Sequence, residues 1–296
     1  MQTYKFKRSF AEDNTLSPRL FNLLENVFPG LNLSGLAEQA RKLGGVWEDV
    51  STPFVKIDDD GTIITHIGVL EIPMRIMGED AIIGGIHAVS THPEYRRQGY
   101  YREVMKEVLD YCDRTYKTLI LTTAQPELYQ PFGFRVIPEH SFQAKFNSPG
   151  GINGLRSLDI TNSDDVQLIH RLLETRIPVS NIVGVFHQKA LFLVNECTRP
   201  LYYFPNLDTL ACLEIQDNQL KLFDLVTANL NFPTIKSLLG QIPQPIEEIS
   251  IYFSPDYLQV DTQAVAETFE GDSLLMVRGI FPADNQQFTL PRSARC

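Results

Sequence analysis

Long apolar runs are missing from this chain of 296 residues. No stretch approaches the roughly 20 apolar residues that a membrane-spanning helix needs, and residues 1–8 lack the apolar core of a signal peptide. Basic residues are also in deficit, with 26 Lys and Arg against 36 Asp and Glu and a net charge of −10. Binding to a phosphate backbone needs a basic surface. We therefore expect a cytoplasmic protein that binds neither a membrane nor nucleic acid.

Cysteine is scarce and scattered, which disfavours both disulfides and a metal site. The four cysteines, Cys112, Cys197, Cys212 and Cys296, contain no C-x-x-C pair. Cys112 falls on the apolar face of a predicted helix, as a free thiol does. The acidic run at 58–60 precedes Gly61 and has no further acidic residue at calcium-loop spacing, so it predicts a hairpin turn. We expect no metal.

The length and one change in composition predict two domains. A chain of this size exceeds the usual single domain. Residues 147–154 read N-S-P-G-G-I-N-G, a cluster of turn formers, so we place the boundary there and expect domains at 1–149 and 150–296. Up to Gly150 there are 16 basic and 19 acidic residues, and beyond it 10 and 17. The second domain is therefore the more acidic one.

Hydrophobic periodicity predicts a similar order of elements in both halves. In the first half we expect strands at 4–8, 54–57, 63–76, 82–89 and 118–124, and helices at 17–28, 33–43 and 100–113. Ser34 is a plausible N-cap of the second helix. In the second half we expect helices at 164–175, 188–196 and 232–239, and strands at 201–204, 209–216, 219–227, 248–253 and 274–281. Residues 291–296 look unstructured.

The most informative stretch joins the strand at 82–89 to the helix that starts at residue 100. The intervening turn reads T-H-P-E-Y-R-R-Q-G. The first N–H groups of a helix have no intrahelical partner and lie at the positive end of its dipole, so such a turn can hold a phosphate or pyrophosphate. Gly99 lets the backbone approach the anion, while Arg96 and Arg97 add positive charge. The turn therefore predicts an anion site.

The residues P-E-Y-R-R-Q-G-Y-Y resemble motif A (Q/R-x-x-G-x-G/A) of the GNAT superfamily of acetyl-CoA-dependent N-acetyltransferases, which grips the pyrophosphate of coenzyme A. Arg96 takes the first place and Gly99 the glycine place, whereas Tyr101 replaces the small residue. A bulky residue there is similar to the enhanced-intracellular-survival (Eis-like) branch. Residues 129–134, Y-Q-P-F-G-F, resemble the Y-x-x-x-G-F segment of GNAT proteins, in which the tyrosine lies near the coenzyme sulfur. Tyr129 matches that tyrosine.

This resemblance implies an α/β (α+β) fold of the GNAT acyl-CoA N-acyltransferase type, with a mixed twisted sheet flanked by helices in two tandem domains. Residues 227–233 have no R-x-x-G, so the second domain is expected to lack the pyrophosphate grip. The sterol-carrier-like domain that often follows in the Eis-like branch is not expected. The implied activity transfers acetyl from acetyl-CoA, without a metal, to a primary amine of a small molecule or peptide by direct attack on the thioester. Whether the chain forms a homo-oligomer is left open.

The resemblance also assigns roles to residues. The coenzyme is expected to lie against Val89, Ser90, Thr91, Arg96, Arg97, Gln98, Gly99, Tyr100, Tyr101, Arg102 and Ala124. A backbone N–H at or near Val89 would polarise the thioester carbonyl, and Tyr129 would protonate or hydrogen-bond the departing sulfur.

The general base is not evident from the sequence. Many GNAT enzymes use a glutamate on the strand before motif A, yet residues 82–90 contain no carboxylate, and His87 is the titratable side chain there. Glu71, the C-terminal carboxylate of Cys296 and water are its rivals. Trp47 follows the two helices that commonly wall the acceptor site, and it is equally plausible as a core anchor. The missing carboxylate keeps an alternative open, in which the chain is a non-catalytic acyl-CoA-binding or sensing protein.

Overall fold

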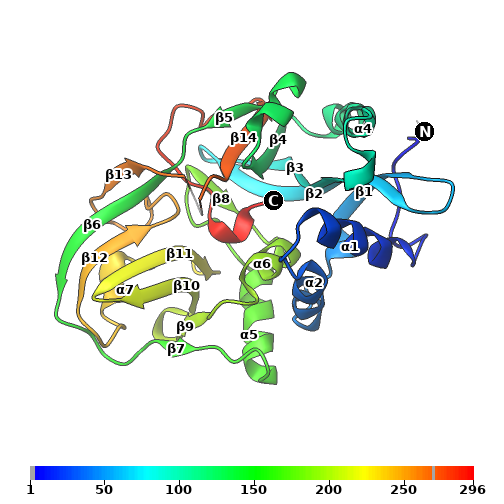
Figure 1. The fold of residues 1–296 in the computed structure, drawn as a ribbon. Helices are drawn as coiled ribbons and strands as arrows, with labels where there is room; N and C mark the ends of the chain where they lie inside the picture. Colours follow the sequence, from blue (N-terminus) through cyan, green and yellow to red (C-terminus); the bar gives the residue numbers. More distant parts are fainter. Residues whose placement is uncertain (1–3, 269–270) are drawn as a thin grey trace.

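Two mixed sheets with helices around them make up the fold (Figure 1). The computed structural model describes residues 4–268 and 271–296, and each of the two sheets that it contains there has seven strands. The first sheet has the order β1-β2-β3-β4-β14-β5, with β8 paired to β2. The second has the order β13-β6-β12-β11-β10-β9-β7.

The elements of the first sheet come from both ends of the chain. Its strands are β1 (Ser51–Ile57), β2 (Ile63–Ile76), β3 (Glu79–Thr91), β4 (Thr118–Thr123), β5 (Arg135–Ile137), β8 (Val183–Val185) and β14 (Leu274–Gly279). The helices around it are α1 (Leu16–Val27), α2 (Leu33–Lys42), α3 (Trp47–Val50) and α4 (Tyr100–Thr115), with 3-10 turns η1 (Pro93–Tyr95), η2 (Pro126–Leu128) and η3 (Gln130–Phe132).

The second sheet is built mainly from the second half. Its strands are β6 (His140–Ser148), β7 (Arg156–Ser157), β9 (Tyr202–Phe204), β10 (Thr209–Gln216), β11 (Gln219–Thr227), β12 (Ile246–Ile251) and β13 (Gln263–Ala266). Its helices are α5 (Ser163–Glu174), α6 (Lys189–Glu196) and α7 (Ile235–Leu239), with 3-10 turns η4 (Pro205–Leu207) and η5 (Arg292–Ala294).

Helix α4 covers one face of the first sheet, as its sequence pattern predicts. Its apolar residues recur at helical spacing, and five of them are buried. They are Val104, Met105, Val108, Leu109 and Cys112. They pack in one cluster with Phe54 of β1 and Ile67 of β2. The opposite face of the helix carries charged residues, and it lies on the outer side of the molecule (Figure 1).

The sheets and the predicted domains do not follow the same division of the chain. Strand β14, from near the end of the chain, lies between β4 and β5 and pairs with both. Strand β8 pairs with β2, while β6 joins the second sheet through β12 and β13. The boundary expected at 149/150 falls between β6 and β7, which both belong to the second sheet. That boundary stays a prediction.

Three local expectations were wrong. The strand expected at 4–8 is only a bridge between Lys7 and Phe54, with backbone bonds from Arg8 to Pro53 and from Val55 to Phe6 on either side of it. The N-cap of α2 is Asn32 rather than Ser34, because the Asn32 side chain accepts the N–H of Gly35. The end of the chain is not unstructured, since it contains η5 and is largely buried.

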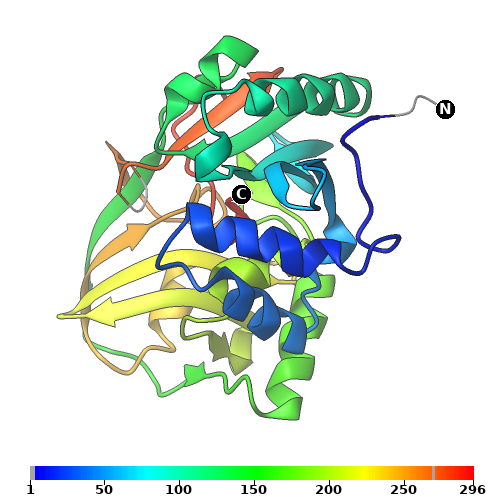
Figure 2. The same cartoon turned by 45° about the vertical axis from the view of Figure 1, so that its right-hand side comes forward.

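Residues 289–296, which we call the strap, lie between the two sheets (Figures 1 and 2). Buried charged groups hold them there. Arg292 donates to Glu196 of α6 at 2.8 and 2.9 Å, and Arg295 donates to Glu139 at 2.7 Å. The hydroxyl of Ser293 donates to Asp224 of β11. The strap is therefore tied to both halves of the chain.

Helices long and apolar enough to cross a membrane are absent from the described part of the chain.

Candidate functional site

Strands β3 and β4 form a fork. They pair in parallel only at Gly84 with Leu119 and at Gly85 with Ile120, although both strands continue beyond these pairs. Past Gly85 the two strands separate, which leaves backbone groups on their facing edges. Val89 on β3 and Ala124, which follows β4, are not buried. Two of the predicted coenzyme residues thus flank the mouth of the fork.

A β-bulge distorts β3 inside the fork. The register with β2 shifts between the pairs His66–Ser90 and Gly68–His87, so that β3 has one extra residue. Ala88 absorbs the irregularity with φ of +49°. A bulge bends its strand and takes a residue out of the ladder. The carbonyl of Ala88 already bonds to Nδ1 of His66 at 2.8 Å, so the backbone of Val89 is the part of the bulge that a ligand could meet.

The turn before α4 has the geometry of an anion site. Gly99, the N-cap residue, has φ of +84°, and no side chain in the described structure caps the helix. A Cβ at Gly99 would meet nothing within 4 Å, so the space in front of the helix is open. Arg97 also has a positive φ, +63°. The first N–H groups of α4 are consequently free for an anion.

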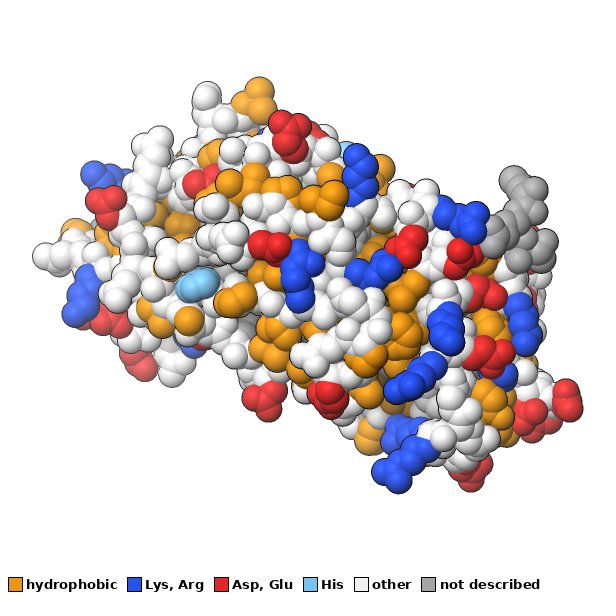
Figure 3. All heavy atoms as spheres, turned by 90° about the horizontal axis from the view of Figure 1, so that it is seen from above, with side chains coloured by type: hydrophobic (Ala, Val, Ile, Leu, Met, Phe, Trp, Pro, Cys, Tyr) orange, Lys and Arg blue, Asp and Glu red, His pale blue; other side chains and the backbone are white. Residues whose placement is uncertain are grey.

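Exposed arginines surround this turn. Arg96, Arg97 and Arg102 are all exposed, and none forms an ion pair with another described residue. The Nε of Arg96 donates to the carbonyl of Thr91 at 3.3 Å. In the view from above, Lys and Arg side chains on the right-hand half of the face are interspersed with Asp and Glu side chains (Figure 3). The turn therefore combines helix-dipole and side-chain charge of the same sign.

The residues next to Gly99 are partly packed. The hydroxyl of Tyr101 donates to the carbonyl of Leu128 at 3.1 Å, and burial raises the pKa of Tyr101. Lys56 Nζ lies 4.4 Å from the centre of the Tyr100 ring, and Gln98 donates to the carbonyl of Glu94 at 3.3 Å. The ring of Tyr101, in the small-residue position of motif A, thus packs against the loop that follows β4.

Tyr129 lies in that same loop, between η2 and η3. It is 7% exposed, and its ring meets the rings of Tyr101 and Phe134 edge-on, with centroids 6.3 and 6.1 Å apart. Burial raises the pKa of Tyr129 to about 12, opposed by a hydrogen bond with Thr123 at the end of β4. The phenol is therefore protonated at neutral pH. The packing brings Tyr129 to the α4 side of the fork.

Two more predicted residues lie on the fork edge of β3. The Oγ of Ser90 is buried and has no partner among the described residues. Thr91 shares a hydrogen bond of 2.7 Å with Thr65 of β2. Ser90 thus has a buried hydroxyl without a partner next to Val89 in the chain, whereas the hydroxyl of Thr91 is satisfied.

His87 is buried, and its imidazole leans over β2 rather than toward β4. Its Nε2 lies 3.0 Å from the Oγ of Ser51 on β1. The ring passes above Gly68, where a Cβ would lie 2.2 Å from ring atoms. Trp47 packs edge-on at 4.3 Å between ring centroids. Burial lowers the pKa of His87 well below its ordinary value, and His66 adds to this, so the imidazole is neutral at pH 7. Nδ1 has no partner in the described structure.

The rivals of His87 lie in different places. Glu71 accepts a hydrogen bond of 3.0 Å from Tyr116, which follows α4, so this carboxylate lies at the closed end of the fork. Cys296 lies inside the fork. Its backbone oxygen accepts two hydrogen bonds from Thr122, one from the backbone N–H at 3.0 Å and one from the side-chain hydroxyl at 2.6 Å. Sequence patterns gave no sign of Ser51, Gly68 or Thr122, because their roles depend on partners far along the chain.

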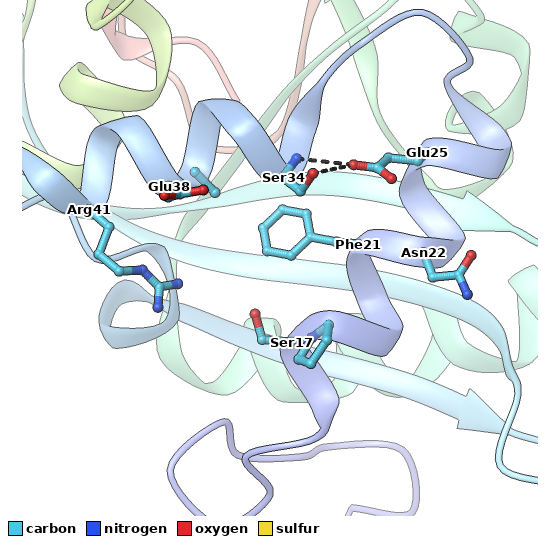
Figure 4. Close-up of a pocket in the computed structure, with 9 residues that line it drawn as sticks. Ser17, Phe21, Asn22, Glu25, Ser34, Glu38 and Arg41 are labelled. Carbon is cyan, nitrogen blue, oxygen red and sulfur yellow. Dashed lines mark hydrogen bonds between the residues drawn. The ribbon is translucent and has the colours of Figure 1, made fainter.

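Two surface grooves lie away from the fork. One, of about 460 Å³, runs between α1 and α2 and is lined by Ser17, Phe21, Glu25 and Arg41 among others (Figure 4). A second, of about 1140 Å³, follows the edge of β1 and includes Ser51. Neither contains residues of β3 or β4, so the fork itself remains the candidate site.

Known proteins are similar to this chain in sequence and in fold. The family model of the acetyltransferase (GNAT) domain matches residues 15–137. Residues 15–137 are therefore similar to a GNAT acetyltransferase domain. The chain is similar to the Escherichia coli K12 protein called "Uncharacterized N-acetyltransferase YhbS", with 28% identity over 92 residues, or 31% of this chain and 54% of the relative. The chain spans about half the length of the curated relatives it matches.

Solved structures extend the similarity of fold beyond the GNAT domain. A probable N-acyltransferase from Enterococcus faecalis V583 has a TM-score of 0.60 and 14% identity, covering 94% of this chain and 72% of that one. Eis1 from Mycobacterium abscessus has a TM-score of 0.55 and 13% identity, covering 94% and 74%. The predicted fold class, GNAT-type and built on two mixed sheets, is confirmed. The range that matches the family model ends at Ile137, so β14 completes the first sheet from outside that range.

Proposed function

We propose that this chain is an acetyl-CoA-dependent N-acetyltransferase that moves the acetyl group to a primary amine. One arrangement carries the proposal: the β3–β4 fork opens beside the uncapped N-terminus of α4, which has three exposed arginines around it. The fork offers backbone groups to an extended chain such as pantetheine. The turn offers N–H groups and positive charge to a pyrophosphate. These are the two chemically distinct parts of coenzyme A.

In the proposed reaction the amine nitrogen attacks the thioester carbonyl carbon, and the carbon–sulfur bond breaks. A backbone N–H near Val89, on the bulge of β3, would stabilise the negative charge that develops on the carbonyl oxygen. Tyr129 keeps its proton at neutral pH, so its hydroxyl would donate a hydrogen bond to the departing thiolate or protonate it. The proton lost by the amine would pass to water, because the imidazole of His87 leans toward Ser51 and burial lowers its pKa well below the ordinary value.

The charge of the turn provides the test. For Arg97→Glu we expect at least about a tenfold loss of acetyl-CoA affinity, because one favourable charge beside the pyrophosphate becomes an unfavourable one. Isothermal titration calorimetry measures this directly. Arg114→Glu, on the last turn of α4, is the matched control and should bind acetyl-CoA normally. Equal affinity of Arg97→Glu and the parent would remove the basis for the pyrophosphate assignment.

The acceptor is tested separately. Free thiol release is followed with acetyl-CoA and a panel of polyamines, aminoglycosides and peptides. Release that depends on one class of amine identifies the acceptor. Binding of acetyl-CoA without thiol release across the whole panel would instead favour the non-catalytic acyl-CoA-binding alternative, which the absence of a carboxylate at 82–90 motivates.

A further inference from the structure

We infer that Cys296, held in the fork by the strap, forms the end wall of the acyl pocket and restricts the donor to short acyl groups. This inference rests on the proposed function, because it assumes that the fork holds an acyl-CoA.

The first argument is the position of Cys296. Its backbone oxygen accepts a hydrogen bond from the N–H of Thr122, and its Sγ lies 3.9 Å from the carbonyl oxygen of Ile120. A Cβ added at Gly85 would lie 2.9 Å from that Sγ. Cys296 therefore occupies the space between the separating strands, with its side chain directed back to the last paired residues. Any group that enters the fork from α4 meets the backbone of Cys296 first.

The second argument is the length that remains. The pair Gly85–Ile120 sets His87 level with Thr122, and because of the bulge it is Ser90, not Val89, that lies two residue steps farther along. Cys296, bound to Thr122, thus lies less than two residue steps, or under about 7 Å, from the level of Val89. If the thioester carbonyl lies at Val89, this distance accommodates a methyl group and its van der Waals contact, and little more.

The third argument is rigidity, because a mobile residue would not discriminate between acyl chains. The strap is fixed by groups on helix α6 and on the link between β5 and β6. Arg295 and Glu139 form an ion pair with side chains 10% and 3% exposed, and Arg292 and Glu196 form one with side chains 6% and 0% exposed. The amide of Asn195 on α6 donates to the carbonyl of Arg295 at 3.0 Å, one residue before the wall.

The experiment compares the affinities of acetyl-, propionyl- and butyryl-CoA by calorimetry, so that it does not depend on turnover. For the parent chain we expect about a tenfold loss of affinity for each added methylene. A variant that lacks Cys296 should lose most of this preference, because the fork then continues toward Gly85. Cys296→Ala keeps the backbone in the fork and should keep the preference. Thermal denaturation checks that each variant is folded.

A matched pair tests the role of the strap in positioning. Asn195→Ala removes the bond to the carbonyl of Arg295 and should weaken the chain-length preference without touching the fork. Asn206→Ala removes a surface bond between Asn206 and Gln241 and should leave the preference unchanged.

The outcomes separate this inference from the function on which it rests. A parent chain that binds no acyl-CoA would contradict the proposed function. Binding of acetyl-CoA with no chain-length preference, or an unchanged preference after removal of Cys296, would contradict the role of Cys296 as the end wall. The proposed function would still stand. Equal loss of preference in Cys296→Ala and in the shortened chain would contradict the assignment to the backbone.

Discussion

At the scale of the residue, the proposed role of Tyr129 depends on one oxygen atom. Tyr129→Phe keeps the ring contacts with Tyr101 and Phe134 and removes the hydroxyl. We expect turnover to fall by about a hundredfold or more, as for loss of a general acid, with acetyl-CoA affinity unchanged. Tyr95→Phe is the control, because it removes a hydroxyl that donates to Asp58 outside the fork. Normal turnover in Tyr129→Phe would reassign this residue to packing.

A second prediction at this scale concerns acid stability. Burial lowers the pKa of His66 to about 4, from an ordinary value near 6.5. Between about pH 4 and pH 6.5 the His66 side chain is protonated in the unfolded chain but neutral in the folded chain. The contribution of His66 to stability is therefore complete above about pH 6.5 and is lost as the pH falls toward 4. The free energy of unfolding falls by on the order of 3 kcal/mol over this pH range.

Substitution isolates this effect from the other groups that titrate in acid. His66→Asn retains a side-chain N–H in position to donate to the carbonyl of Ala88, which His66 Nδ1 contacts at 2.8 Å. Urea unfolding at pH 7 and at pH 4.5 should show a smaller loss for His66→Asn than for the parent. Parallel losses would contradict the assignment.

At the scale of the element, the start of α4 depends on the left-handed backbone of Gly99. Gly99→Ala introduces no contact within 4 Å, so its cost is conformational, on the order of 1 kcal/mol. We expect that loss of stability together with weaker acetyl-CoA binding. Gly30→Ala is a close control, since Gly30 has φ of +93° and open space as well, but follows α1. It should lose stability without losing affinity.

The elements also show what a sequence does and does not reveal. Strands β2, β10 and β11 were predicted with the bounds that they have, because each forms a short-range apolar pattern that ends at a turn. The core face of α4 was predicted for the same reason. The place of β14 between β4 and β5 was not, because its partners lie more than 130 residues away and no local pattern records them.

The candidate site divides in the same way. The turn with Arg96, Arg97 and Gly99 was evident because a strand, a glycine and a helix start follow one another in the chain. The imidazole of His87 was expected to face the reaction, yet it leans toward Ser51, a contact that depends on the missing side chain of Gly68. The burial of the strap was also missed. Its side chains Arg292, Ser293 and Arg295 are polar, so the sequence predicted an exposed tail rather than a segment held by buried partners.

At the scale of the whole molecule, stability depends on a buried charge cluster between the two sheets. Arg176 and Asp224 pair at 2.8 Å with side chains 2% and 0% exposed, and Ser293 of the strap donates to the same carboxylate. Arg176→Met leaves Asp224 buried without its partner, so we expect a loss of about 3–5 kcal/mol in urea unfolding. The double variant Arg176→Met with Asp224→Leu should recover most of it. A double variant as unstable as the single one would show that the charges themselves are needed.

The position of β14 has a consequence for how this protein is made. During synthesis, β4 and β5 leave the ribosome long before residues 274–279, so for most of translation the strand that belongs between them does not yet exist. Two unpaired strand edges are then exposed, and such edges invite pairing with other chains. We therefore expect these two edges to stay open to pairing with other chains until residues 274–279 have been synthesised.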